Sequence, residues 1–275
     1  MFVIRKCVQE ICGNRFAMRE KMAMSQYEAS LTAEVNGLTL HYAKVGHGRP
    51  VILLHGNGED HHLLETQIRQ LSEAGYCVYA LDSRGHGANE PLTEVHFDDM
   101  AEDVFAFIQA LHLNKPALYG HSDGGIIALL LELRHPGTLG VMAISGTNLS
   151  PDGLSAAFIE EYSELNKKTP DPLITLMLTE PHIDPLLLRT IRIPVLVTAG
   201  ENDLILPEET ERIAAELPNS TKVIVSGADH GSYTRLRSSI TRNSYRRILN
   251  GCWRAFLQTT AFPAPTQRSV TSLTV

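Results

Sequence analysis

A serine lies between two glycines in Gly120-His121-Ser122-Asp123-Gly124, which fits the pattern Gly-x-Ser-x-Gly. Residues 115–119 before it form a short apolar run typical of a strand, and residues 126–133 after it form an apolar run typical of a helix. A serine at so sharp a turn has a strained backbone, and its hydroxyl projects over the sheet edge. The glycines suit positions too crowded for a β-carbon. The segment predicts a nucleophilic serine, with an ordinary glycine-rich turn as the alternative.

A serine hydroxyl is a weak nucleophile near neutral pH, so it needs a histidine base and a carboxylate that orients this histidine. His230 is the candidate base because it follows the last strand-type run of the chain. Asp203 is the candidate acid because it comes shortly after the strand-type run 195–198. A helix-capping role for Asp203 is the alternative, although intervening residues separate it from the next helix. Asp229 is a competing acid, but a sequence neighbour rarely reaches its own histidine ring in the needed geometry.

Short apolar strands alternate with amphipathic helices along most of the chain. The pair Asn36-Gly37 predicts a β-hairpin over residues 31–45, because it tolerates the positive φ of a type I′ turn. Runs that are apolar on both faces suit parallel strands covered by helices. The alternation predicts an α/β fold with a doubly wound, mostly parallel sheet. Strands are predicted at 51–54, 77–81, 115–119, 140–145, 193–199 and 222–225, and helices at 61–74, 96–113, 123–135, 207–216 and 238–258.

Residues 149–188 interrupt this alternation. No strand fits there, and apolar residues within 156–162 and 172–178 predict two short helices. Insertions after a strand's carboxyl end tend to cover the ligand crevice, so we expect a short helical cap, with a surface excursion as the alternative. The predicted organisation is an N-terminal extension (1–28), a core (29–148 and 189–258), the cap insertion (149–188) and a flexible, Thr-, Ser- and Pro-rich tail (259–275).

The bulk composition suits one sizeable core, since the 275 residues are 43% hydrophobic and 20% charged. The formal net charge of −7 argues against nucleic-acid binding. No apolar run reaches the ~20 residues needed to span a bilayer, and residues 1–24 hold no apolar core of a secretory signal. The four cysteines lack metal-ligand spacing and are interpreted as free thiols in a reducing cytoplasm. We therefore predict a cytoplasmic protein without a metal site.

Several short motifs stand in a characteristic order along the chain. They are His55-Gly56, Asp82–Gly87, Gly120–Gly124, Gly200–Asp203 and His230. This ordered set resembles the α/β-hydrolase fold superfamily over roughly residues 30–258, and it is specific for the superfamily but for no single substrate. The resemblance implies the chain order nucleophile, acid, histidine, which selects Ser122, Asp203 and His230 as catalytic residues. The short cap is similar to that of small bacterial esterase-like members.

Ester cleavage places negative charge on the former carbonyl oxygen, which backbone N–H groups can bind in an oxyanion hole. The resemblance implies one donor from Asp123, after the nucleophile, and one from Asn57, in the glycine-rich loop. A carboxylate beside an oxyanion is unfavourable unless it points away, and the sequence leaves the direction of the Asp123 side chain open. His55 and His121 flank the site and are interpreted as structural neighbours.

The loop Asp82–Gly87 is interpreted as structural, with Arg84 and Asp82 holding it by hydrogen bonds. His86 is a candidate for the mouth of the pocket, and a solvated position in the loop is the alternative. Apolar cap residues are candidates for a wall of the substrate site: Phe158, Leu176, Met177 and Leu178.

These residues together predict a cofactor-independent serine hydrolase acting on a small carboxylic ester, thioester or lactone through an acyl-enzyme on Ser122. An acyltransferase or perhydrolase would use the same three residues with a different acceptor. A dehalogenase with an aspartate nucleophile is disfavoured because serine occupies the centre of the turn. A non-catalytic ligand receptor on the same scaffold is the alternative from another class. The substrate and the oligomeric state cannot be read from the sequence.

Overall fold

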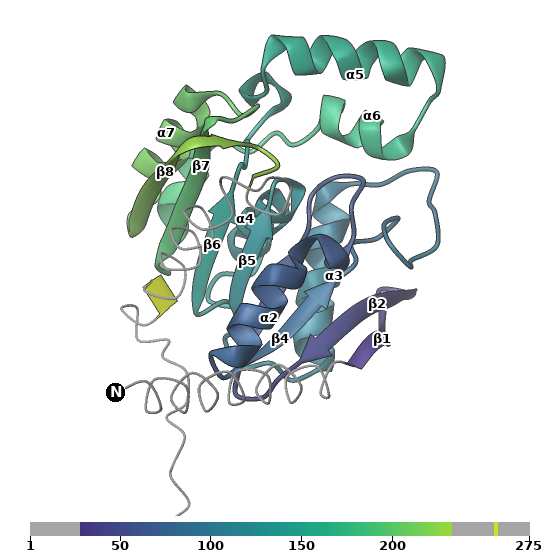
Figure 1. Cartoon of the computed structure of the whole chain (residues 1–275), viewed down its shortest axis with the longest axis vertical. Helices are drawn as coiled ribbons and strands as arrows, with labels where there is room; N and C mark the ends of the chain where they lie inside the picture. The colour runs from purple at the N-terminus through teal and green to yellow at the C-terminus, as the bar shows by residue number, and fades with distance from the viewer. Residues whose placement is uncertain (1–27, 233–255, 258–275) are drawn as a thin grey trace, which may run out of the picture.

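The computed structural model describes residues 28–232 and 256–257, which form a sheet with helices on both sides (Figure 1). The sheet has eight strands in the order β1-β2-β4-β3-β5-β6-β7-β8. From β4 to β8 all neighbours are parallel, while β2 is antiparallel to β1 and β4, which confirms the predicted mostly parallel sheet. The strands are β1 (Glu28–Val35), β2 (Leu38–Val45), β3 (Arg49–Leu54), β4 (Tyr76–Leu81), β5 (Ala117–His121), β6 (Val141–Ser145), β7 (Val195–Asn202) and β8 (Ser220–Asp229).

The predicted hairpin is confirmed in β1 and β2. Val35 pairs with Leu38 at its closed end, and the two turn residues have positive φ, 48° at Asn36 and 78° at Gly37. This is the backbone that a type I′ turn requires. The Asn36 amide also donates to Asp103 at 2.9 Å, which ties the turn to a helix of the core.

Helices cover both faces of the sheet, and alternate strand residues enter two separate apolar clusters. In β3, Ile52 and Leu54 pack with α3 (Phe97–Ala110), α4 (Asp123–Arg134) and α7 (Pro207–Glu216). Val51 and Leu53 instead pack against α2 (Glu65–Glu73) on the opposite face, together with Phe256 and Leu257. Alternate residues of the strands are therefore buried in two apolar cores, one on each face of the sheet, as a doubly wound sheet requires.

Most predicted elements end within three residues of the observed bounds, and two differ by four residues at one end. The helix expected over 61–74 begins as a 3₁₀ turn, η1 (His61–Leu64), because the backbone and ring of His61 are drawn to Asp82 before α2 starts. The strand expected over 222–225 runs to Asp229, since its pairing with β7 extends to Asn202 opposite Asp229. Asp203 and His230 therefore follow directly on β7 and β8. The predicted helix over 238–258 lies outside the described residues except for 256–257, as do most of the predicted extension and the tail.

The segment between β6 and β7 holds the two predicted cap helices. They are α5 (Ala156–Lys168) and α6 (Pro172–Thr179), flanked by the 3₁₀ turns η2 (Pro151–Gly153) and η3 (Pro185–Thr190). Asp171 caps α6 by accepting from the Leu173 amide at 2.7 Å, and Pro172 fits the first helical position. Both helices stand off one end of the sheet, at the top of Figure 1. Among the described residues no helix combines the length and apolar character needed to cross a bilayer.

Candidate active site

Ser122 lies in the strained turn between β5 and α4. Its φ of 53° and ψ of −116° fall where a residue with a β-carbon is rarely found. A β-carbon on Gly120 would overlap the carbonyl of Gly124, and one on Gly124 would lie 2.5 Å from the carbonyl oxygen of Leu54. The Ser122 amide is fixed by the carbonyl of Ser145 at 2.8 Å. The strain and the close approach predicted for this turn are both confirmed.

Three side chains that are far apart in the sequence meet at the carboxyl edge of the sheet. His230 Nε2 lies 3.1 Å from Ser122 Oγ, and His230 Nδ1 lies 2.6 Å from Asp203 Oδ1. The side chain of Asp203 is 1% exposed, whereas that of His230 is 20% exposed. The Asp203 carboxylate also accepts from the amides of Gly200 at 3.1 Å and Ile205 at 3.2 Å. Those backbone donors hold the carboxylate toward the imidazole, and the arrangement can pass a proton from hydroxyl to ring.

The other reading of the acid is not supported by the geometry. Asp229 is exposed, and its carboxylate accepts from the Ser232 hydroxyl at 2.5 Å. Asp203 is not a helix cap either, because α7 begins at Pro207 with Leu206 as its N-cap residue. It is therefore Asp203, and not Asp229, whose carboxylate contacts the ring of His230.

The glycine-rich loop after β3 lies against Ser122. A β-carbon on Gly56 would be 3.2 Å from Cβ of Ser122. The Asn57 amide donates from Nδ2 to Asp123 Oδ2 at 2.9 Å and to the carbonyl of Leu173, on α6, at 3.0 Å. The direction of the Asp123 side chain, left open by the sequence, is thus toward Asn57. Burial raises the pKa of Asp123 to about 6, although the hydrogen bond from Asn57 and the charge of His230 oppose this.

Two buried histidines, His55 and His121, lie beside these residues. His55 donates from Nδ1 to the Gly56 carbonyl at 2.7 Å and accepts at Nε2 from the Ser83 amide at 3.0 Å. Burial lowers the pKa of His55 to about 4, so the ring is neutral near pH 7. His121 lies with Nδ1 3.1 Å from Ser145 Oγ, and its ring centre is 4.9 Å from that of His230. Both side chains have the structural contacts expected of them.

Arg84 and Asp82 hold the loop after β4 through separate partners. The Arg84 guanidinium binds Asp103 at 2.6 and 2.7 Å and Asp99 at 3.0 Å. These two acids lie one helical turn apart on α3 and so form one face toward the arginine. Asp82 instead accepts from His61 and from the Ala88 amide. Both side chains therefore hold the loop by hydrogen bonds, as predicted.

His86 is buried, so the alternative of a solvated loop histidine is wrong. Its Nδ1 donates to the carbonyl of Arg84 at 3.0 Å, and its ring centre lies 5.1 Å from that of His55. Burial lowers the pKa of His86, which keeps the ring neutral and leaves Nε2 as an acceptor. A place at the mouth of the pocket stays a prediction for this residue.

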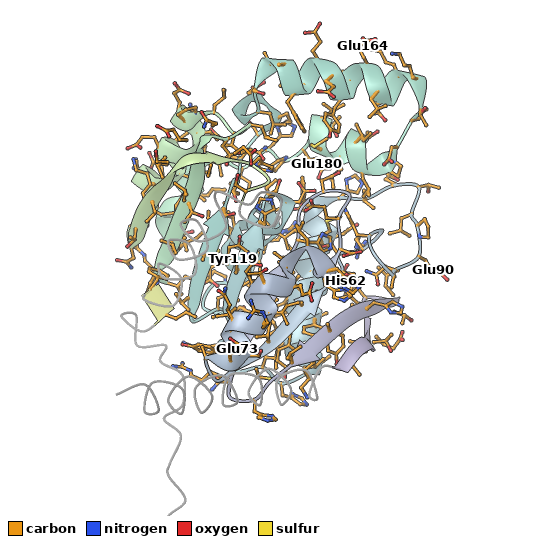
Figure 2. The ribbon with its side chains drawn as sticks, in the orientation of Figure 1. His62, Glu73, Glu90, Tyr119, Glu164 and Glu180 are labelled. Atoms are coloured by element: carbon orange, nitrogen blue, oxygen red, sulfur yellow. The ribbon has the colours of Figure 1, made fainter. Side chains whose placement is uncertain are left out.

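The four predicted apolar cap residues have different environments. Phe158 stacks on Tyr162 with ring centres 4.3 Å apart, and the two are half-buried on α5. Leu176 is 2% exposed and belongs to the main apolar core, whereas Met177 and Leu178 are half-buried. The labelled Glu164 projects from the outer side of α5, away from the sheet (Figure 2). A substrate-facing role for the apolar residues stays a prediction.

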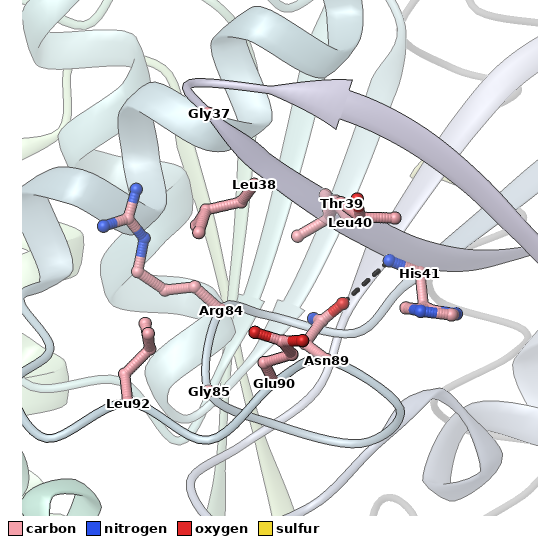
Figure 3. Close-up of a pocket in the computed structure, with 10 residues that line it drawn as sticks. All are labelled: Gly37, Leu38, Thr39, Leu40, His41, Arg84, Gly85, Asn89, Glu90 and Leu92. Atoms are coloured by element: carbon pink, nitrogen blue, oxygen red, sulfur yellow. Dashed lines mark hydrogen bonds between the residues drawn. The ribbon is translucent and has the colours of Figure 1, made fainter.

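A cavity of about 370 Å³ lies between the β1–β2 hairpin and the loop after β4 (Figure 3). It contains none of the predicted site residues, and the guanidinium of Arg84 on its wall is already paired with α3. It is lined by Gly37, Leu38, Thr39, Leu40, His41, Arg84, Gly85, Asn89, Glu90 and Leu92. Within residues 28–232 and 256–257, no three His, Cys, Asp or Glu side chains are grouped to hold a metal ion.

One site residue escaped the sequence reasoning. Gly146 follows β6 with a φ of 57°, and a β-carbon there would lie 2.8 Å from the ring of His230. It would also lie 3.4 Å from Asp203 Oδ2. A side chain at this position would therefore displace the histidine from its aspartate. The signal in the sequence was a glycine directly after a strand-type run that ends at the same sheet edge.

Comparisons with known proteins point to one fold family. A family model described as the alpha/beta hydrolase fold matches residues 49–172. AB hydrolase superfamily protein YisY of Bacillus subtilis is 40% identical over 101 residues, which cover 36% of this chain and 38% of the Bacillus protein. Serine hydrolase BPHL of Homo sapiens is 29% identical over 210 residues, 65% of this chain and 72% of the human protein. A thermophilic esterase from Thermogutta terrifontis has the same fold, with a TM-score of 0.67, 21% identity and coverage of 86% and 99% of the two chains.

Proposed function

This chain belongs to the α/β-hydrolase fold superfamily, and we propose that within it the protein is a serine hydrolase cleaving a small carboxylic ester, thioester or lactone. The observation that carries the proposal is the convergence of Ser122, His230 and Asp203 at hydrogen-bonding distances of 3.1 and 2.6 Å. A buried carboxylate that orients a partly exposed histidine toward a serine hydroxyl is an arrangement suited to nucleophilic catalysis.

The proposed reaction proceeds in two steps. Nε2 of His230 takes the proton of Ser122 as its oxygen attacks the substrate carbonyl, and Asp203 stabilises the imidazolium that results. The imidazolium then gives the proton to the leaving alcohol or thiol, which leaves the acyl group on Ser122. In the second step the same ring takes a proton from water as the water oxygen attacks the acyl-enzyme. The imidazolium then returns this proton to Ser122 Oγ as the bond to the acyl group breaks, which releases the acid and restores the free serine.

The oxyanion of each tetrahedral intermediate is proposed to bind the backbone N–H groups of Asn57 and Asp123. Two structural features support this assignment. The Gly56 backbone lies against Ser122, and Asp123 is the first residue of α4, whose opening N–H groups have no partner within the helix. The Asn57 side chain also keeps the Asp123 carboxylate occupied, which reduces repulsion between that carboxylate and the oxyanion.

The substrate site is proposed to lie between this edge of the sheet and the cap. The hydrogen bond from Asn57 to the Leu173 carbonyl brings α6 close to the nucleophile, and α6 is mostly apolar. A moderately apolar acyl or alcohol group would suit such a wall. Cys77 is a buried free thiol, which suits the cytoplasmic location that we propose.

The test is a pair of serine substitutions assayed on p-nitrophenyl esters of increasing chain length and on a lactone set. Ser122→Ala should abolish fluorophosphonate labelling and lower kcat by on the order of 10⁴- to 10⁶-fold. Ser145→Ala is the matched control, because this buried serine also lies 3.1 Å from a histidine, at the end of the neighbouring strand. It should keep the label. Turnover and labelling that survive in Ser122→Ala would refute the proposal, and added alcohol or peroxide would reveal acyl transfer in the product ratio.

A further inference from the structure

We propose that Glu209 is a positioning residue that couples the foot of the cap to the acid Asp203. The inference rests on the proposed function, since it assigns Glu209 a role in orienting that acid. Two segments are involved. The cap root is residues 149–155, where the chain leaves β6 for the cap, and the acid loop is residues 203–206, between β7 and α7.

The cap root and the acid loop are joined by a short antiparallel ladder. The Ser155 amide donates to the Leu204 carbonyl at 2.9 Å, and the Leu206 amide donates to the Gly153 carbonyl at 2.8 Å. Between these bonds Leu154 and Ile205 form an isolated antiparallel bridge, and their side chains are buried. Because buried backbone groups need their hydrogen-bond partners, a shift of the cap root would strain or break these bonds unless the acid loop followed it.

The same loop holds the carboxylate of Asp203. Its Oδ1, which contacts His230, also accepts from the amide of Ile205, the residue that bridges to the cap root. A shift of the ladder would therefore change the distance or angle between the carboxylate and the imidazole. The foot of the cap and the proposed acid are one hydrogen-bonded assembly.

Glu209 fixes this assembly from α7. The side chain lies in the first turn of the helix and is 4% exposed, and its Oε1 accepts from the Leu149 amide at 2.7 Å. The carbonyl of Leu149 in turn accepts from the Ile183 amide at 2.8 Å, which brings in the returning end of the cap. Gly153 packs so closely that a β-carbon there would lie 2.8 Å from Cγ of Glu209. The buried side chain of Glu209 thus binds the first residue of the cap root by a hydrogen bond and packs against Gly153 near its other end.

The chain offers a matched control in Glu132. This glutamate is 3% exposed and accepts from the amides of Gly137 at 2.6 Å and Leu139 at 3.1 Å. It holds a loop in the same way as Glu209, but it lies near the end of α4 that is distant from Ser122. Loss of either carboxylate should cost stability, and only the loss of Glu209 should reach the catalytic histidine.

The experiment compares Glu209→Ala, Glu209→Gln and Glu132→Ala in the full chain, with p-nitrophenyl acetate as the probe. Both alanine variants should lower Tm, but only Glu209→Ala should lower kcat, by about tenfold, which is a small part of what a positioned acid–base group supplies. The acid limb of its kcat/KM profile should move to lower pH, because a less well held Asp203 stabilises the imidazolium less. His121 and Asp123, which also face His230, are unchanged by the substitution. Glu209→Gln keeps an acceptor for Leu149 and should restore both readouts.

A Glu209→Ala enzyme with the kcat and acid limb of Glu132→Ala, at equal loss of Tm, would overturn the proposal. If Glu209→Ala does not fold, Gly153→Ala approaches the same contact from the cap side and should give the same fall in kcat and shift of the acid limb. Unchanged values in that variant would equally overturn it. Labelling of Ser122 in the wild-type chain separates this outcome from failure of the proposed function, because it reports on the serine whether or not Glu209 has the proposed role.

Discussion

The sheet edge carries two histidine–aspartate pairs of nearly the same local geometry. His230 Nδ1 lies 2.6 Å from Asp203, and His61 Nδ1 lies 2.8 Å from Asp82. Both aspartates directly follow parallel strands, β7 and β4, and both side chains are 1% exposed. A search for a histidine held by a buried carboxylate would find either pair, so this feature alone does not identify a catalytic site.

The pairs differ at the other ring nitrogen and around the carboxylate. His230 Nε2 faces the hydroxyl of Ser122, whereas His61 Nε2 is buried and has no hydrogen-bond partner in the part of the chain that the structure describes. Asp82 also accepts from the amides of His61 and Ala88, so it fastens two loops together. One pair therefore directs a ring nitrogen toward a serine hydroxyl, and the other holds the backbone.

The charges in the second pair agree with a structural role. Burial raises the pKa of Asp82, but the hydrogen bonds from His61 and Ala88 outweigh it and bring the value down to about 2. The hydrogen bond to Asp82 raises the pKa of His61 despite burial. Both shifts favour an ion pair in the folded state, in which His61 is already protonated and has no basic nitrogen to accept a proton.

The largest difference between the two pairs is expected in kcat when the aspartate of each is replaced by asparagine. Asp203→Asn should lower kcat by on the order of 10³- to 10⁴-fold, because the amide holds the wrong tautomer of the imidazole. Asp82→Asn should change kcat by less than about tenfold, since its histidine contacts no nucleophile. Steady-state kinetics on p-nitrophenyl acetate measure both. Comparable losses in the two variants would mean that His61 takes part in the chemistry.

In stability, in contrast to activity, Asp82→Asn should be the more damaging of the two substitutions. Asp82 accepts hydrogen bonds at both oxygens, so an asparagine would place an N–H group against the Ala88 amide or the His61 ring. We expect Asp82→Asn to lower the free energy of unfolding by about 3 kcal/mol, the range for a broken buried pair. Urea denaturation followed by fluorescence or circular dichroism gives this value. A loss below that of Asp203→Asn would contradict the structural role of the Asp82 pair.

The pH dependence of stability should separate the pairs further. The folded-state pKa of Asp82, about 2, lies below its unfolded value, so its stabilisation is present above about pH 4 and is lost as the pH falls toward 2. The shift corresponds to about 2 kcal/mol. The difference in unfolding free energy between wild type and Asp82→Asn should shrink by this amount between pH 5 and 2. A difference that stays constant over this interval would show that the ion pair does not titrate as proposed.

Much of the candidate site could be predicted because its geometry has a local cause. The turn at Ser122 depends on Gly120 and Gly124, which lie within the same five residues. In the structure a β-carbon on either glycine would lie too close to a backbone carbonyl, as predicted. Asp203 and His230 could be chosen because each follows a strand of the same sheet, and parallel strands bring their carboxyl ends to one edge. Periodicity and chain order were sufficient for these residues.

The contacts that could not be predicted depend on tertiary placement. His61 and Asp82 are 21 positions apart, and Glu209 reaches Leu149 across 60 positions, with no pattern in the sequence that links them. The partners of Arg84 could not be named either, because Asp99 and Asp103 are 15 and 19 positions away and lie beside it only in the folded chain. The length of β8 is likewise set by its pairing with β7, which the composition of 226–229 does not indicate.

The smallest effect is expected from His61→Asn, which leaves the Asp82 carboxylate in place. An asparagine amide can donate to Asp82 from about the position of Nδ1, and the substitution removes the buried Nε2 that has no partner among the described residues. It loses the ring contact with His62, whose centre is 4.1 Å away. We therefore expect the free energy of unfolding to change by less than about 1 kcal/mol at pH 8, where the histidine charge contributes least. kcat/KM should match wild type, whereas His230→Asn should be inactive, and a His61→Asn enzyme as impaired as His230→Asn would erase the distinction between the pairs.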